Sequence, residues 1–307
     1  MNGLNLLQQY IKEQELTGAI LLSPINLHYF AGFTGTTGFA IITEDKAFMI
    51  TDFRYTEQAT KQCEGYTVIQ YETTVMDTLV DIFNEHHIHE GLFAIEGKQM
   101  PVDTYESLCD TLDENFDFTS VNFAKLRAVK REDELELLRI AANIGDESFA
   151  ALLPQLKVGM TENEVRIILE TEMLKRGSEE PSFATIIASG SRSSMPHGVA
   201  SDKVIEAGDF VTIDFGSVYK GYHSDMTRTI VMGPASDLQK KLYSIVLEAQ
   251  KRGVAAVRAG ITGKELDAIC RDYIKEHGYT KEFNHGTGHG LGLEIHEEPV
   301  ANTKSDT

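Results

Sequence analysis

Residues 209–231 read DFVTIDFGSVYKGYHSDMTRTIV, and this stretch decides the fold of the second half of the chain. Apolar residues alternate through 209–216, which predicts a strand, and continue through 221–231, which predicts a return strand. The residues between them, 216–221, form a plausible hairpin connection. The stretch therefore predicts an antiparallel pair of strands.

The predicted hairpin can bring two of its three aspartates to one face of the sheet. Asp214 ends the first strand and Asp225 lies on the return strand. Two carboxylates that close raise each other's pKa, and both stay ionised most easily around a metal ion. The residues leave one alternative open, in which Asp214 caps the turn at Gly216 and Asp225 pairs with Arg228.

The second segment with candidate chemistry, residues 285–297, reads HGTGHGLGLEIHE. Its glycines disfavour a helix and favour backbone packed closely against a neighbour or a ligand. His285 and His289 lie four positions apart, a spacing that places them on one face of a strand or a helix. His296 follows in the same run, and His197, after a proline, is a fourth candidate. Core filling is a poor explanation for so many histidines in a glycine-rich strand.

A weak internal repeat relates two parts of the second half. The same offset in sequence separates Thr161 from Thr262 and Gly177 from Gly278. Each Thr opens a capping box with a Glu three residues later, and each Gly suits a left-handed helix cap. Chance similarity is the alternative, but the shared spacing favours two related half-domains with a site between them.

The first part of the chain predicts a separate α/β domain. A helical pattern over residues 4–16 is followed by strand patterns over 19–22, 39–42, 47–50, 65–69 and 92–95. Basic residues over 122–131 interrupt an acidic chain, just before a long helical pattern over 132–153. We therefore expect domains over residues 1–124 and 125–307.

Composition excludes several classes of protein. Of the 307 residues, 42% are apolar and 24% are charged, which is typical of globular chains rather than disordered ones. The net charge of −19 would repel a phosphate backbone, so no nucleic-acid partner is expected. We find neither a membrane span nor a signal peptide, and the three cysteines form no CxxC pair. We expect a cytoplasmic protein without a membrane partner.

The combined motifs resemble a known family. Motifs of zincin peptidases, α/β-hydrolases and Walker NTPases are missing from the sequence. Residues 214–216, 224–229 and 285–297 resemble the pita-bread metallopeptidases, in particular the branch of Xaa-Pro dipeptidase (prolidase) and aminopeptidase P. Residues 26–33 and 51–55 resemble the creatinase-like N-terminal domain of that branch.

The resemblance implies an α/β (α+β) fold in two domains. A creatinase-like α/β domain over residues 1–124 would precede a pseudo-symmetric pita-bread catalytic domain over 125–307, with a curved, mostly antiparallel sheet. The implied assembly is a homodimer. The implied substrates are proline-containing dipeptides or oligopeptides.

The resemblance also implies a dinuclear site with two divalent metal ions, most often manganese, with cobalt and zinc as alternatives. Asp214 would chelate one ion, Asp225 would bridge both and His289 would bind the other. A bridging hydroxide would attack the carbonyl before proline. The histidines His197, His285 and His296 would hold the substrate and stabilise the tetrahedral intermediate.

The family completes its site with two glutamates beyond the last histidine motif, and no residue here matches them. We therefore expect that the sequence is a fragment, and that a product ending at Thr307 would bind metal weakly and show little activity. The implied activity is hydrolysis of Xaa-Pro bonds in dipeptides or longer peptides. The alternative is a non-catalytic or metal-free pita-bread module, either creatinase-like or peptide-binding.

Overall fold

The structure, a computed structural model, describes residues 2–307 and divides into two compact units, Met1–Val129 and Lys130–Thr307. The boundary that the sequence suggested, after residue 124, falls inside a short 3-10 helix, η1, over Phe123–Arg127. Each unit has its own buried core, so each is described by itself.

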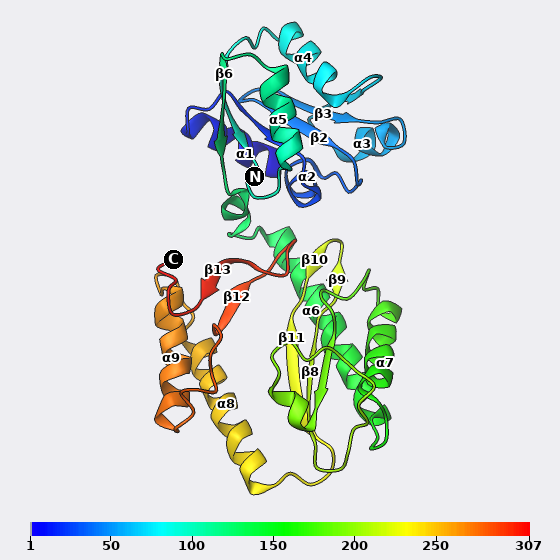
Figure 1. The fold of residues 1–307 in the computed structure, drawn as a ribbon, viewed down its shortest axis with the longest axis vertical. Coiled ribbons are helices and arrows are strands. Elements are labelled where there is room, and N and C mark those ends of the chain that lie inside the picture. Colours follow the sequence, from blue (N-terminus) through cyan, green and yellow to red (C-terminus); the bar gives the residue numbers. More distant parts are fainter. Residues whose placement is uncertain (1) are drawn as a thin grey trace. The chain divides into compact units, whose positions relative to one another are not determined.

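The N-terminal unit is built on one six-stranded mixed sheet in the order β4-β3-β2-β1-β5-β6 (Figure 1). Neighbours β1 and β2, and β2 and β3, are antiparallel, whereas the other three pairs are parallel. The strands are β1 Gly18–Leu21, β2 Phe39–Ile42, β3 Ala47–Thr51, β4 Thr67–Gln70, β5 Gly91–Ile95 and β6 Phe116–Ser120. The predicted strands over 19–22, 39–42, 47–50, 65–69 and 92–95 are thus confirmed, within two residues at their ends.

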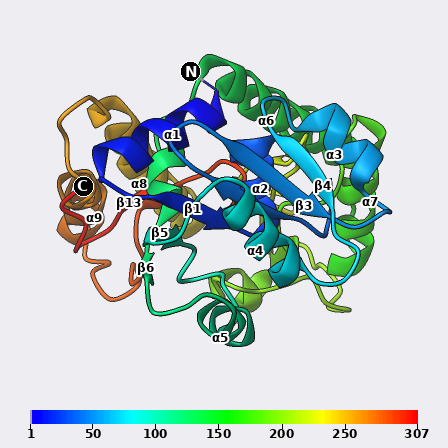
Figure 2. The same cartoon turned by 90° about the horizontal axis from the view of Figure 1, so that it is seen from above.

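Helices cover both faces of this sheet. Every residue of β1, β2 and β3 is buried, as a sheet covered on two faces requires. Figure 2 shows α1 and α3 on one side of the sheet and α4 and α5 on the other. The helices are α1 Gly3–Glu13, α2 Pro24–Ala31, α3 Thr56–Gln62, α4 Val75–Glu85 and α5 Val102–Thr111.

The C-terminal unit begins with two helices that pack on a three-stranded antiparallel sheet. Helix α6 spans Glu132–Leu152 and α7 spans Glu162–Lys175. The sheet has the order β11-β8-β7, with strands β7 Ile186–Ser189, β8 Phe210–Phe215 and β11 Met226–Val231. Side chains from both helices and all three strands share one buried core.

One detail of this sheet differs from the sequence prediction. The predicted connection over 216–221 is not a bare loop, because it contains β9, Val218–Tyr219, which pairs with β10, Tyr222–His223. The return strand is therefore two strands, β10 and β11, with a break between them.

The second half of the unit repeats the pattern of two helices and antiparallel strands. Helix α8 spans Asp237–Ala256 and α9 spans Gly263–Glu276, and β12, Gly288–Gly290, pairs with β13, Glu297–Ala301. Strands β12 and β13 lie beside α8 and α9, and form no ladder with β8 or β11 among the described residues (Figure 1). The antiparallel architecture is thus divided into separate small sheets.

The internal repeat is confirmed at the helix ends. Capping boxes at Thr161 and Thr262 begin α7 and α9, which have the same length. Gly177 and Gly278 follow with φ of 97° and 91°, in the left-handed region that glycine tolerates. Within residues 2–307, we find no helix that is long and apolar enough to span a membrane.

Candidate active site

Asp214 lies on the face of β8 that is turned away from the core. Val211, Ile213 and Phe215 are buried, while Asp214 alternates with them and is half-buried. Thr227 lies directly opposite on β11, and its Oγ1 donates a hydrogen bond of 2.7 Å to Asp214 Oδ1. The sequence reasoning missed Thr227, although its place in the SDMTRT motif could have indicated it.

Asp225 lies in the break between β10 and β11 rather than on a continuous strand. The break exists because Ser224 turns back on Ser217: the Ser224 amide donates to Ser217 O at 2.9 Å, and the Ser217 amide donates to Ser224 Oγ at 2.9 Å. Gly216 permits this approach, since a Cβ there would lie 1.9 Å from Ser224 O. The turn places the Asp225 carboxylate next to that of Asp214, and their mutual repulsion contributes to the raised pKa of Asp214.

The open alternative for the two aspartates is wrong. Asp214 accepts from Thr227 rather than capping the turn at Gly216. Arg228 reaches Asp146 on α6 at 3.2 Å, and no ion pair joins it to Asp225 among the described residues.

His289, on β12, contacts Asp225. Its Nε2 lies 3.3 Å from Asp225 Oδ2, and its Nδ1 lies 3.0 Å from Gly290 O. His296 packs beside it, with 4.4 Å between the ring centroids. About a quarter of the His289 and Asp225 side chains stays accessible. The structure thus brings the two aspartates, His289 and His296 together.

Burial is the main reason that the pKa values of both aspartates are raised. For Asp214 the repulsion by Asp225 adds to burial, whereas the Thr227 hydrogen bond and the charges of His197 and His289 oppose it. For Asp225 the charges of His289 and His296 oppose burial. Both carboxylates therefore sit in a place that favours a bound cation.

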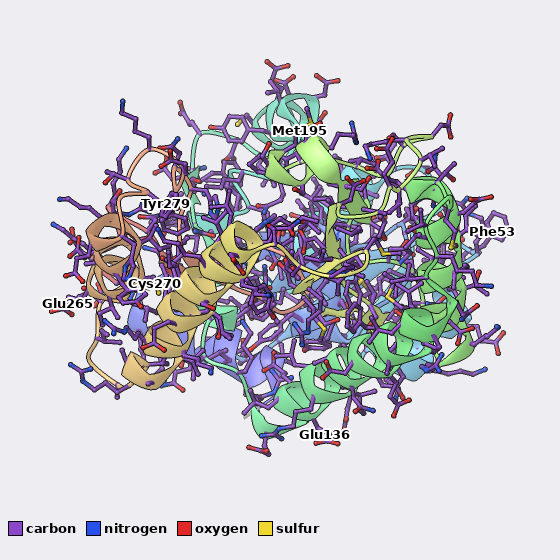
Figure 3. All side chains as sticks on the ribbon, turned by 90° about the horizontal axis from the view of Figure 1, so that it is seen from below. Phe53, Glu136, Met195, Glu265, Cys270 and Tyr279 are labelled. Carbon is purple, nitrogen blue, oxygen red and sulfur yellow. The ribbon has the colours of Figure 1, made fainter. Side chains whose placement is uncertain are left out.

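The two remaining predicted histidines lie on exposed loops. His197 follows the 3-10 helix η3, Gly190–Ser194, whose exposed neighbour Met195 is marked in Figure 3. His197 is close enough to Asp214 to lower the pKa of that carboxyl. The ring of His285 packs against Phe283, 4.8 Å between centroids.

A buried glutamate, missed by the sequence reasoning, fixes the segment before His197. Glu162, at the start of α7, accepts hydrogen bonds from the amide and hydroxyl of Ser189 at 2.8 and 2.9 Å, and from those of Ser201 at 3.1 and 2.6 Å. Arg192 pairs with it at 3.1 Å. The sequence did not single out Glu162, because an acidic residue in the first turn of a helix is common.

A second buried ion pair fixes the segment that carries His296. Lys130 Nζ lies 2.6 Å from Glu297 Oε2, and their side chains are 9% and 1% exposed. Glu297 Oε1 also accepts from the Glu294 amide at 3.2 Å. Gly292 lies against this carboxylate, which a Cβ would approach to 2.5 Å.

The donor set suits a divalent metal ion. Carboxylate oxygens from Asp214 and Asp225 and an imidazole nitrogen from His289 are ligands of manganese, cobalt and zinc alike. No group of three or more His, Cys, Asp or Glu within residues 2–307 is already arranged as a metal cage. Since His289 Nε2 and Asp225 already face each other, the residues fit a metal whose binding would replace this contact.

Comparison with known proteins decides the family. Residues 136–307 match metallopeptidase family M24, and residues 4–129 match the creatinase/prolidase N-terminal domain. The chain belongs to metallopeptidase family M24. The family explains why the two units occur in one chain, and it implies divalent metal ions at the site.

Relatives within the M24 family cover nearly all of this chain. The structure of Xaa-Pro dipeptidase from Bacillus anthracis is 45% identical, with a TM-score of 0.94, and the match covers 99% of this chain and 85% of that one. Prolidase from Pyrococcus furiosus is 36% identical, with a TM-score of 0.88, over 98% and 87% of the two chains. An uncharacterised peptidase of Bacillus subtilis is 44% identical over 94% of this chain and 82% of its own length.

These M24 relatives confirm the fold class that the sequence predicted, and also the assignment to a metallopeptidase. They do not favour the alternative of a non-catalytic or metal-free module.

Proposed function

We propose that the protein hydrolyses peptide bonds before proline, as an Xaa-Pro dipeptidase or an Xaa-Pro aminopeptidase. The observation that carries the proposal is the meeting of Asp214, Asp225 and His289, in a chain whose relatives include Xaa-Pro dipeptidases. The site geometry and the similarity to relatives are separate lines of support, since the geometry comes from this chain's own side chains.

In this proposal Asp214, Asp225 and His289 bind the metal ions, which supply Lewis acidity and a nucleophilic water at neutral pH. Thr227 orients the Asp214 carboxylate through its hydrogen bond. His296, packed on His289, and the exposed His197 and His285 bind the peptide and donate hydrogen bonds to the oxyanion. The half-buried setting strengthens these interactions because it excludes part of the solvent.

We further propose, from the resemblance alone, that the ions are two manganese ions, with cobalt and zinc as alternatives. A homodimer and a cytoplasmic location are proposed on the same ground. The three cysteines, which are all free, suit a reducing compartment.

The test is the variant Asp225→Asn, which keeps the shape of the side chain but removes its charge. We expect lower metal uptake, measured by elemental analysis, and loss of Xaa-Pro dipeptide hydrolysis. The loss should exceed the roughly 10–100-fold cost that is typical of residues that merely orient metal ligands. Xaa-Ala dipeptides serve as the substrate control.

The matched control is Asp146→Asn, which removes an exposed aspartate paired with Arg228 in the same unit. Its activity should stay within about twofold of the unchanged protein, because exposed ion pairs contribute little. Equal activity of Asp225→Asn and the unchanged protein would refute the proposal. So would a failure of the unchanged, metal-loaded, full-length protein to cleave any Xaa-Pro peptide.

A further inference from the structure

Residues 283–287, which we name the histidine loop, lie between α9 and β12 and carry His285. The loop has no helix or strand of its own, and His285 is exposed at its centre. An exposed loop without regular structure is a poor support for a histidine that must meet a substrate. The contacts of the loop with α9 therefore decide where His285 lies.

Arg271 on α9 binds the backbone of the histidine loop at two points. Its Nη1 donates to Phe283 O at 2.7 Å, and its Nη2 donates to His285 O at 2.7 Å. The guanidinium also lies over the Phe283 ring, 4.5 Å from the centroid. The planar fork of arginine can bind two carbonyls at once, whereas a lysine ammonium cannot match this geometry.

Asp267, one turn earlier on α9, orients that arginine and binds the far end of the loop. Its carboxylate accepts from Arg271 Nε at 2.6 Å and from Nη2 at 2.9 Å. Oδ1 also accepts from the Thr287 amide at 3.0 Å and from the Thr287 hydroxyl at 2.9 Å. The Asp267 side chain is only 1% exposed, so nearly all its hydrogen-bonding partners are protein groups.

The equivalent ion pair of the other half-domain makes no such contacts with the residues that the structure describes. The repeat offset that relates α7 to α9 places Arg166 where Asp267 stands and Glu170 where Arg271 stands. These two also pair, at 2.7 Å, but the other hydrogen bond of Arg166 goes to Asn163 on its own helix. A helix can therefore carry an ion pair at this position without binding a loop. The contacts of Asp267 and Arg271 hold the loop rather than the helix.

We propose that Asp267 and Arg271 are positioning residues, which fix the histidine loop so that His285 can bind the substrate. Both residues lie on α9, which packs beside α8; Glu265 and Cys270 of α9 are labelled in Figure 3. The catalytic part of this proposal rests on the proposed function, whereas the structural part, control of the loop, does not.

The first experiment measures the loop without reference to activity. In Arg271→Lys the cation remains but the fork is lost, so amide hydrogen exchange of Thr287, whose amide donates to Asp267, should become roughly tenfold faster or more. Glu170→Gln breaks the equivalent pair on α7 and should leave exchange of the histidine loop unchanged. Asp267→Asn, with its isosteric amide, gives a second test at the same loop. Unchanged loop exchange in both Arg271→Lys and Asp267→Asn would overturn the proposal.

The second experiment is a double-mutant cycle with His285→Ala. A displaced histidine should lower kcat/KM for an Xaa-Pro dipeptide roughly 10–100-fold in Arg271→Lys. In the His285→Ala background the same change should cost less than about twofold, because its effect passes through the missing ring. An equal loss in both backgrounds would overturn the role in positioning His285.

The two experiments separate this proposal from the proposed function. If the unchanged full-length protein cleaves no Xaa-Pro peptide, the proposed function fails, and the exchange measurement still decides whether the pair controls the loop. If activity is present and the cycle shows no coupling, the positioning role fails alone. Thermal unfolding of each variant identifies any that has failed to fold, and the remaining variants then decide the outcome.

Discussion

Asp225 and Asp267 lie in the same unit but in opposite electrostatic settings. Burial outweighs the nearby histidine charges at Asp225, so its pKa is raised. Burial acts in the same direction at Asp267, but the hydrogen bonds from Arg271 and Thr287 outweigh it, so the pKa of Asp267 is lowered. The environment of Asp225 suits a metal ligand, and that of Asp267 suits a carboxylate that stays ionised and has a structural role.

The lowered pKa of Asp267 predicts how stability depends on pH. A carboxyl whose pKa is lower in the folded state stabilises that state above its unfolded pKa of about 3.9. This stabilisation is lost as the pH falls through the folded pKa. Asp267→Asn should therefore lower the free energy of unfolding by about 3 kcal/mol at pH 7, where it leaves Arg271 unpaired. The difference should shrink as the pH falls below about 3.9 and through the lower folded pKa of Asp267.

Denaturant titrations of both proteins across this pH range would measure the effect. Glu170→Gln is the control. Its partly buried i,i+4 pair with Arg166 is more accessible than that of Asp267, and such helix pairs contribute only about 0.2–0.5 kcal/mol. A difference that stayed constant from neutral to acid pH would show that the charge of Asp267 is not what stabilises the fold.

At the scale of elements, the break between β10 and β11 is what sets Asp225 apart from the ladder. Register pairs run from Phe210 opposite Val231 to Phe215 opposite Met226, and they end where Ser224 turns towards Ser217. Gly216 is the residue that makes room for this turn. The position of a proposed metal ligand therefore depends on a missing Cβ in the neighbouring strand.

We predict that Gly216→Ala destabilises the protein by about 1–3 kcal/mol, because the new Cβ would overlap Ser224 O. Metal affinity should fall as well, since the carboxylate of Asp225 would move with the backbone. Calorimetry of thermal unfolding and metal titration measure the two effects.

Gly145→Ala is the matched control. Its Cβ would meet only ordinary contacts, 3.5 Å from Phe215 and 3.6 Å from Met226, inside helix α6. Alanine is favoured over glycine in a helix, so this variant should be more stable by about 0.5–1 kcal/mol. If both alanine variants proved equally harmless, the explanation of the break would be wrong.

At the scale of the whole molecule, the chain is two units with separate cores. The N-terminal core joins Ile20, Phe93 and Leu79 from β1, β5 and α4. The C-terminal unit has one core around β8 and a smaller cluster of Ile245, Ala249 and Ile274 between α8 and α9. Each unit is of the size at which domains commonly fold alone.

We therefore predict that residues 1–129, produced alone, unfold in one cooperative thermal transition. Within this fragment Phe93→Ala, at a fully buried position, should cost about 3–5 kcal/mol. Leu92→Ala, on the same strand but 38% exposed, should cost about 0.5 kcal/mol. A broad, non-cooperative transition of the fragment would contradict the prediction.

The sequence by itself determined the local elements and the nature of the site. Capping boxes, alternating strands and glycine caps act over a few residues, so the helices α7 and α9 and the strands of the first unit could be predicted closely. The motif residues also indicated the family. These features are local, or are carried by the types of the residues themselves.

Only the tertiary structure decided how the site is built. It placed His289 beside Asp225, interrupted the return strand at Ser224, and joined Asp267 and Arg271 to the histidine loop. Each feature depends on groups distant in sequence meeting in space, or on a close approach that one missing Cβ allows. Residue spacing alone cannot encode such contacts, because they arise from the packing of whole elements.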